Sequence, residues 1–170
     1  TNSATSALHI ACLALGLSKG DYVWTSPITF VASANCAKYC QAEVDFVDID
    51  QSTGLISIEI LENKLKHAEK IGKLPKILIP VHLTGSSCEM KAIKRLSEKY
   101  KFFVIEDASH AIGGKYESNP VGSCKYSDIT VFSFHPVKMI TTDEGGMALT
   151  NNVSLFNKMN LYRNNGIARD

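Results

Sequence analysis

The feature of this chain that most constrains its fold is the regular alternation of short apolar segments with segments of helical periodicity. Apolar runs bounded by turn residues predict buried strands, and they occupy residues 22–25, 43–47, 76–81, 102–105, 129–134 and 147–150. Helical patterns lie before, between and after them, at residues 7–17, 29–39, 58–70, 90–100 and 153–164. Strands that alternate with helices favour an α/β fold, a three-layer sandwich with a mostly parallel sheet.

Size and charge narrow the functional classes. The 170 residues are enough to bury the core of one domain. The formal net charge of +1, with both signs interspersed, offers no basic surface for nucleic acid or an acidic membrane. No apolar run approaches the roughly 20 residues of a membrane span, and no signal peptide pattern is present at the start. We therefore expect a cytoplasmic protein that binds neither nucleic acid nor membranes.

The chain has five cysteines, an odd number set in apolar or loop surroundings. Cys36 and Cys40 are four residues apart and would share a helix face, which invites interpretation as a metal site. No His or Cys partner lies at the spacing of a zinc-binding motif. We interpret the cysteines as buried thiols and expect no metal.

A lysine follows the apolar strand predicted at residues 129–134. Pro136 ends this strand because proline has no backbone N–H for the sheet, which places Lys138 at the rim. Ligands bind at the carboxyl ends of strands in open α/β sheets. Most lysines are solvated surface charges; a lysine positioned by a rigid strand can also serve as a Schiff-base amine.

Two further segments allow both a structural and a functional interpretation. Asp107 follows the apolar strand at residues 102–105, where it is either a cap for the next turn or a buried carboxylate that needs a cationic partner. Thr5 or Ser6 is the expected N-cap of the first helix. The free N–H groups of that first turn either bind a phosphate or belong to an ordinary capped helix.

The lysine segment resembles a known family signature. SFHPVK at residues 133–138 and TTDEGG at residues 141–146 are similar to the motif of the DegT/DnrJ/EryC1/StrS sugar aminotransferases, which are pyridoxal-phosphate enzymes of the aspartate-aminotransferase (type I) fold. Within that family, residues 2–8, residues 25–35 and the lysine segment most resemble the transaminases of the pseudaminic acid pathway. The resemblance covers residues 1–170 and implies a partial large domain, with an N-terminal segment and a small C-terminal domain outside it.

The resemblance implies a catalytic pair. Lys138 would form the Schiff base with pyridoxal 5′-phosphate and then act as general acid and base. Asp107 would pair with the protonated pyridine nitrogen and keep the ring cationic.

The resemblance also implies the other cofactor contacts. Phe30 would stack on the ring, and His110 would lie near the phenolic oxygen. Ser133, with the backbone of Ala4 and Thr5, would hold the phosphate.

By the same resemblance, the substrates are glutamate as amino donor and a nucleotide-linked, UDP-type 4-keto-6-deoxy sugar aminated at C4 for glycan biosynthesis. The full-length enzyme would be a homodimer. The alternatives are another sugar aminotransferase of the family, 3-amino or dTDP-linked, and a non-catalytic α/β binding domain. A dehydratase relative would carry histidine at position 138, so Lys138 argues against it. Asn165 departs from the histidine usual in the family and receives no role.

Overall fold

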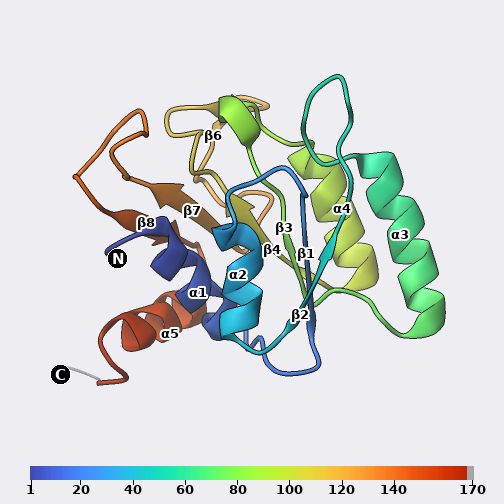
Figure 1. Ribbon diagram of the computed structural model, residues 1–170, viewed down its shortest axis with the longest axis horizontal. Helices are drawn as coiled ribbons and strands as arrows, with labels where there is room; N and C mark the ends of the chain where they lie inside the picture. The colour runs from blue at the N-terminus through green and yellow to red at the C-terminus, as the bar shows by residue number, and fades with distance from the viewer. Residues whose placement is uncertain (168–170) are drawn as a thin grey trace.

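The computed structural model describes residues 1–167 as one mixed sheet between two layers of helices (Figure 1). The six strands lie in the order β2-β1-β3-β4-β7-β8. Their bounds are β1 Tyr22–Thr25, β2 Glu43–Phe46, β3 Ile77–Ile79, β4 Phe103–Asp107, β7 Ile129–Ser133 and β8 Gly146–Leu149. β8 pairs with β7 antiparallel, whereas the other neighbours pair parallel. The predicted mostly parallel sheet is confirmed.

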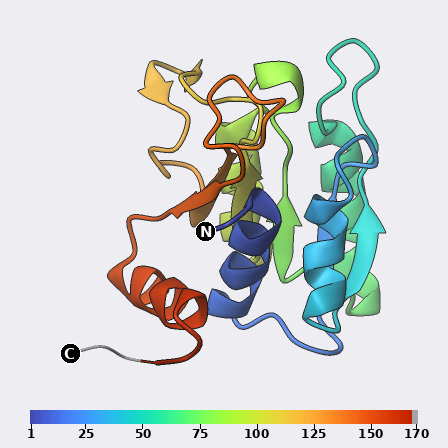
Figure 2. The same cartoon turned by 60° about the vertical axis from the view of Figure 1, so that its left-hand side comes forward.

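Helices cover both faces of the sheet. α1 (Ala4–Ala14), α2 (Ala32–Tyr39) and α5 (Val153–Arg163) pack on one face, and Figure 2 brings this face forward. α3 (Ile58–Ile71) and α4 (Met90–Tyr100) pack on the other. The predicted three-layer sandwich is therefore confirmed.

The alternation of side chains along β3 divides the core between these two layers. Ile77 and Ile79 belong to the cluster under α1, α2 and α5, and Leu78 belongs to the cluster under α3 and α4. Successive strand residues point to opposite faces, so a strand buried on both sides is apolar throughout.

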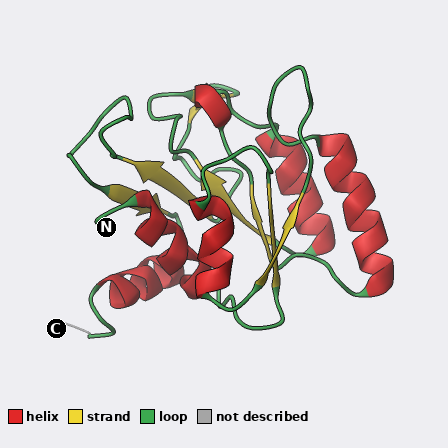
Figure 3. Ribbon diagram, in the orientation of Figure 1, coloured by secondary structure: helices red, strands yellow, loops and turns green. Residues whose placement is uncertain are grey.

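Two small elements lie between the predicted strands and helices (Figure 3). A 3₁₀ turn, η1 (Leu83–Gly85), follows β3. β5 (Lys115–Tyr116) and β6 (Asn119–Pro120) form a two-residue antiparallel ladder. Neither joins the central sheet.

The structure corrects the predicted start of the first helix. α1 begins at Ala4, three residues before the predicted range, and its N-cap is Ser3 rather than Thr5 or Ser6. Ser3 is extended, and its hydroxyl accepts the backbone N–H of Ser6 at 3.2 Å. Ala4 and Thr5 consequently lie in the first turn, where a helix has N–H groups without intrahelical acceptors.

Other boundaries shift by a few residues. α2 begins at Ala32 rather than at position 29, so Thr29 and Phe30 lie in the preceding loop. β4 extends to Asp107, and β7 stops at Ser133.

The strand order reverses next to β1, because the chain runs outward to β2 and then returns to β3. Such a reversal opens a crevice at the carboxyl ends of the strands. Beyond β8, the backbone of Thr1 pairs with Gly146: Thr1 N donates to Gly146 O at 2.9 Å, and Gly146 N donates to Thr1 O at 3.0 Å. The segment before α1 thus lies along the start of β8.

All five cysteines are buried free thiols. Burial raises the pKa of Cys88 to about 12 and that of Cys40 to about 11. Among residues 1–167, no cluster of three or more His, Cys, Asp or Glu has an arrangement suited to a metal ion. None of the described helices combines the length and apolarity needed to cross a bilayer.

Candidate active site

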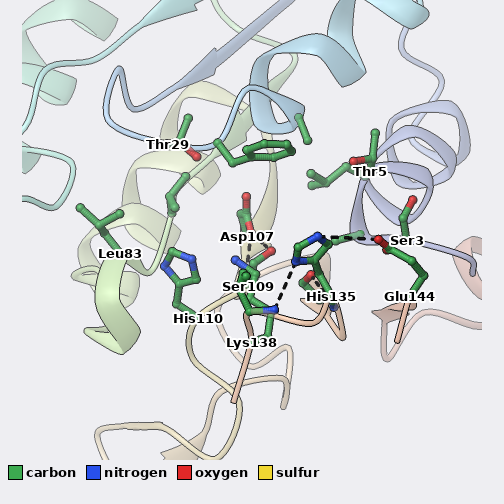
Figure 4. A pocket seen from close by; sticks show the side chains of 17 residues that line it. Ser3, Thr5, Thr29, Leu83, Asp107, Ser109, His110, His135, Lys138 and Glu144 are labelled. Carbon is green, nitrogen blue, oxygen red and sulfur yellow. Dashed lines mark hydrogen bonds and ion pairs between the residues drawn. The ribbon is translucent and has the colours of Figure 1, made fainter. Parts of the chain in front are cut away.

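A pocket of about 640 Å³ lies beyond the carboxyl ends of β4 and β7, a volume typical of sites for small ligands (Figure 4). Segments from across the chain meet there. Every residue for which the sequence predicts a catalytic or cofactor-binding role lines this pocket: Ala4, Thr5, Phe30, Asp107, His110, Ser133 and Lys138. The structure brings these residues together, and the role of each remains a prediction.

Lys138 lies in a turn after β7 and is half-buried. Its backbone N–H donates to the carbonyl oxygen of His135 at 2.9 Å, which closes the turn around Pro136. Figure 4 shows Lys138, Asp107 and His110 grouped together, with Ser3 and Thr5 across the pocket.

Asp107 is the last residue of β4, and its side chain is buried. Its backbone is fixed on both sides, because its N–H donates to Pro80 O at 2.9 Å and its carbonyl accepts from His82 N at 3.0 Å. Its carboxylate oxygens accept hydrogen bonds from Ser33 and Ser109. A carboxylate can therefore stay buried here without a structural ion pair.

The first turn of α1 forms the opposite end of the pocket. Its position depends on Gly146, because a Cβ there would come within 3.0 Å of the backbone of Ser3 and Ala4. Ser133, at the end of β7, adds a further hydroxyl to the lining of the pocket. The N-terminus of α1, with the positive end of its dipole, is suited to an anion.

His110 is held from the side by η1. The backbone N–H of Thr84 donates to His110 Nδ1 at 3.3 Å. In the neutral ring, the proton is therefore on Nε2. Burial and the nearby charge of Lys138 lower the pKa of His110, against the opposing effect of Asp107. His110 is thus biased toward a neutral ring that donates through Nε2.

Phe30 lies in the loop before α2, and its side chain is 71% exposed. The sequence places this aromatic at the head of a helix, whereas the structure places it just outside. Its carbonyl accepts the N–H of Ser33 at 3.2 Å, which links the loop to the first turn of α2. The exposed ring forms an apolar wall of the pocket.

His82 and Glu106 form a buried pair behind the pocket, 2.8 Å apart. Cys88 N donates to His82 Nδ1 at 3.2 Å, so His82 carries its proton on Nε2 and donates it to Glu106. The other oxygen of Glu106 accepts from the hydroxyls of Ser127 and Thr130. His82 thus has a structural hydrogen bond and does not line the pocket.

The sequence did not predict several residues that complete the site. Ser109 follows Asp107 by two residues, a spacing at which an Asx turn forms, so a sequence signal existed. Ser33 is 74 positions from Asp107, and no local pattern connects them. His135 and Glu144 line the pocket and approach to 3.7 Å. Both lie inside the family motif, without an assigned role.

The groups in this pocket suit one kind of ligand. They comprise an amine, a buried carboxylate, an exposed aromatic ring and an anion-binding helix start. A flat molecule with a phosphate at one end, a basic ring nitrogen and a reactive carbonyl matches all four.

Comparison with known proteins agrees with this site. The model of the DegT/DnrJ/EryC1/StrS aminotransferase family matches residues 1–170. A relative from Campylobacter jejuni subsp. jejuni serotype O:23/36 (strain 81-176), UDP-4-amino-4,6-dideoxy-N-acetyl-beta-L-altrosamine transaminase, is 46% identical over 169 residues, which are 99% of this chain and 43% of the relative. This match confirms the predicted resemblance to transaminases of the pseudaminic acid pathway.

Solved structures show the same fold. PseC of Helicobacter pylori, described as an aminotransferase involved in the biosynthesis of pseudoaminic acid, has a TM-score of 0.86 and 35% identity over 99% of this chain and 44% of its own. NtdA of Bacillus subtilis, solved with bound cofactor PMP, has a TM-score of 0.83 and 34% identity over 95% of this chain and 35% of its own.

The chain thus spans less than half the length of the curated relatives that it matches first. The match of the family model over its whole length, together with the fold and the residues of the pocket, leads to one conclusion: the chain belongs to the DegT/DnrJ/EryC1/StrS aminotransferase family.

Proposed function

We propose that this chain is the large, cofactor-binding domain of an aminotransferase that uses pyridoxal 5′-phosphate. The observation that carries the proposal is the convergence of Lys138 and Asp107, from the ends of two neighbouring strands, on one pocket. The N-terminus of α1 lies at the far end of that pocket. Membership of an aminotransferase family, and the PMP bound to NtdA, support the choice of cofactor.

The residues present fit this cofactor. The first turn of α1 and the hydroxyls of Thr5 and Ser133 offer hydrogen bonds to the phosphate. Phe30 offers an aromatic face to the ring. Asp107 offers a carboxylate oxygen to the ring nitrogen.

Each residue then has a defined chemical task. When bound, pyridoxal phosphate supplies an aldehyde that links to amines and a ring that accepts electrons. Lys138 would hold the cofactor through its Nζ atom and, as a free amine, would carry the proton from the donor's α-carbon to the carbon of the cofactor that bears the amine. Asp107 would keep positive charge on the ring nitrogen of the cofactor. His110 would donate a hydrogen bond from Nε2 to the phenolic oxygen of the cofactor.

We propose glutamate as amino donor and a UDP-linked 4-keto-6-deoxy sugar as acceptor, with the amine delivered to C4. The altrosamine transaminase of Campylobacter jejuni supports a UDP-linked amino sugar.

We also propose that the full-length enzyme is a cytoplasmic homodimer. The rim of the pocket carries apolar side chains with large exposed fractions: Phe30 (71%) and Val137 (78%) line it, and Met139 (65%) follows Lys138 in the chain. A second copy of the enzyme would cover such a patch. The free thiols agree with a reducing compartment.

The test of the cofactor site is reduction with borohydride. The purified protein with pyridoxal phosphate should absorb near the visible edge, and after reduction the label should map to the peptide containing Lys138. Lys138→Ala should abolish the label, whereas Lys158→Ala, on α5, should retain it. A Lys138→Ala variant that is still labelled would contradict the proposal.

The identity of the sugar needs a separate assay. UDP-, GDP- and dTDP-linked 4-keto and 3-keto sugars should be offered to the full-length enzyme with glutamate. The UDP-linked 4-keto-6-deoxy sugar should give the largest kcat/KM. A larger kcat/KM with a 3-keto or dTDP-linked sugar would favour another aminotransferase of the family.

A further inference from the structure

The carboxylate of Asp107 has more hydrogen-bond donors around it than the sequence predicts. Ser109 donates twice to Oδ1, from its backbone N at 3.1 Å and from its hydroxyl at 2.6 Å. Ser33 donates to Oδ2 at 2.6 Å. A carboxylate has about four acceptor directions. Three are used by protein groups, and the fourth, on Oδ2, remains for a group in the pocket.

Ser33 acts through Asp107 rather than on a ligand. It lies in the first turn of α2, has 0% exposure and does not line the pocket. Its hydroxyl has one proton, and an ionised carboxylate can only accept. That proton is therefore directed to Asp107.

This assignment fixes the direction of the next hydrogen bond. Thr29 Oγ1 lies 3.0 Å from Ser33 Oγ, and either atom could donate on geometry alone. Because the proton of Ser33 is committed to Asp107, Thr29 must donate to Ser33. The result is a series of two hydrogen bonds, from Thr29 in the pocket wall to Ser33, and from Ser33 to Asp107. Hydrogen bonds in such chains polarise and strengthen one another.

We propose that Ser33 is a positioning residue, which holds Oδ2 of Asp107 so that its remaining acceptor direction faces the ring nitrogen of a pyridoxal-type cofactor, and that Thr29 reinforces it. The inference rests on the proposed function, because it assigns a detail of the same site. The proposed role of Ser33 can be distinguished from a role in packing, because it affects only the contact between Asp107 and the ring nitrogen of the ligand. The phosphate and the ring faces are bound elsewhere in the pocket.

Two probes separate these roles: pyridoxamine 5′-phosphate, and its 1-deaza analogue, in which C–H replaces the ring nitrogen. Neither links covalently to Lys138. Calorimetry should show that the unmodified protein prefers pyridoxamine phosphate. In Ser33→Ala, affinity for pyridoxamine phosphate should fall at least about tenfold, the effect of one hydrogen bond to a charged group, while affinity for the 1-deaza analogue is unchanged.

Thr29→Val and Thr29→Ser form the matched pair, because valine has the shape of threonine without its hydroxyl and serine keeps the hydroxyl. Thr29→Val should lower affinity for pyridoxamine phosphate about twofold, which follows from the loss of a second, indirect hydrogen bond. Thr29→Ser should bind like the unmodified protein. Thermal melting should show that each variant is folded.

Three results would overturn the inference. Equal loss of affinity for both probes in Ser33→Ala would assign Ser33 to the fold alone, and no loss for either would remove its role. An unmodified protein that binds both probes equally would exclude the contact at the ring nitrogen, even with Lys138 labelled by borohydride. Binding of neither probe, with no label on Lys138, would instead refute the proposed function itself.

Discussion

Single residues at this site depend on partners that are distant in the sequence. The strand-end position of Asp107 and the family motif around Lys138 were enough to predict that both belong to one site. The contact of the Ser33 hydroxyl with Asp107 was not predictable. It forms only because α2 packs on the sheet near the end of β4. Thr84 is similar: its N–H reaches His110 from 26 positions away.

The first residue-scale prediction concerns the protonation of His110. Burial and the charge of Lys138 lower its pKa below the usual 6.5. His110 should therefore remain mostly neutral at pH 6.5, with its proton on Nε2, as measured by ¹⁵N NMR of the imidazole rings. His110→Gln identifies the resonance by its loss. A titration midpoint at or above 6.5, or a proton on Nδ1, would contradict the expectation.

The second residue-scale prediction concerns Gly146. A methyl group there would collide with the backbone of Ser3 and Ala4, which cannot rotate away. Gly146→Ala should destabilise the protein by about 1–3 kcal/mol, typical of overpacking, and should weaken binding of pyridoxamine phosphate. Urea unfolding and calorimetry measure both effects.

Gly145→Ala is the control for this substitution. Its new methyl would meet chiefly the hydroxyl of Thr142, the end of a side chain that can move. The loss of stability should be smaller than for Gly146→Ala. Equal losses would show that the backbone contact at Ser3 is not what makes Gly146 necessary.

At the scale of elements, the sequence predicted the order and type of the helices and strands but not the details of their ends. The start of α1 was predicted too late, because Ser3, Thr5 and Ser6 are all acceptable N-caps. The structure selects Ser3, since the chain before it is held against Gly146. α2 was predicted to start too early, because the hydroxyl of Thr29 bonds to a side chain instead of capping the helix.

Glu106, on β4, bonds to His82, which follows β3, and to Thr130 on β7. Its titration should therefore change the stability of the protein. Burial alone would raise its pKa, but hydrogen bonds from His82, Ser127 and Thr130 bring the pKa below the usual 4.5. Because the folded pKa is the lower one, the stabilisation is present above pH 4.5 and is lost as the pH falls through the folded value.

Glu106→Gln should therefore reduce the fall of stability as the pH drops below 4.5 towards the lowered pKa of the folded state. At pH 7 it should cost about 1–3 kcal/mol, because the glutamine NH2 group would face a donor that the carboxylate accepted and leave that donor without an acceptor. Urea unfolding as a function of pH measures both. Glu98→Gln, exposed on α4, is the matched control. A pH dependence identical in both variants would contradict the assignment to Glu106.

At the scale of the whole molecule, the three layers and the position of the pocket at the carboxyl ends of the strands followed from the alternation of elements. The apolar rim of the pocket could not be predicted in this way, because the exposure of each side chain depends on the complete fold. Phe30, Val137 and Met139 are more than half exposed. The site is therefore open on the side of these residues.

The homodimer proposal gives this rim a testable role. Val137→Ser with Met139→Ser should weaken self-association of the full-length enzyme by at least about tenfold, because two apolar side chains would lose their buried contacts. Sedimentation analysis measures the change. Val153→Ser, equally exposed on α5, should have no effect. Unchanged association in the double variant would place the interface elsewhere.

The pairing of Thr1 with Gly146 also bears on when the site forms. These residues are 145 positions apart, so the turn before α1 acquires its final neighbour only after nearly the whole described chain has folded back. Contacts of such long sequence separation are slow to form, since the entropy of closing the loop precedes any gain. The first turn of α1 consequently reaches its final position in the pocket only when β8 is in place.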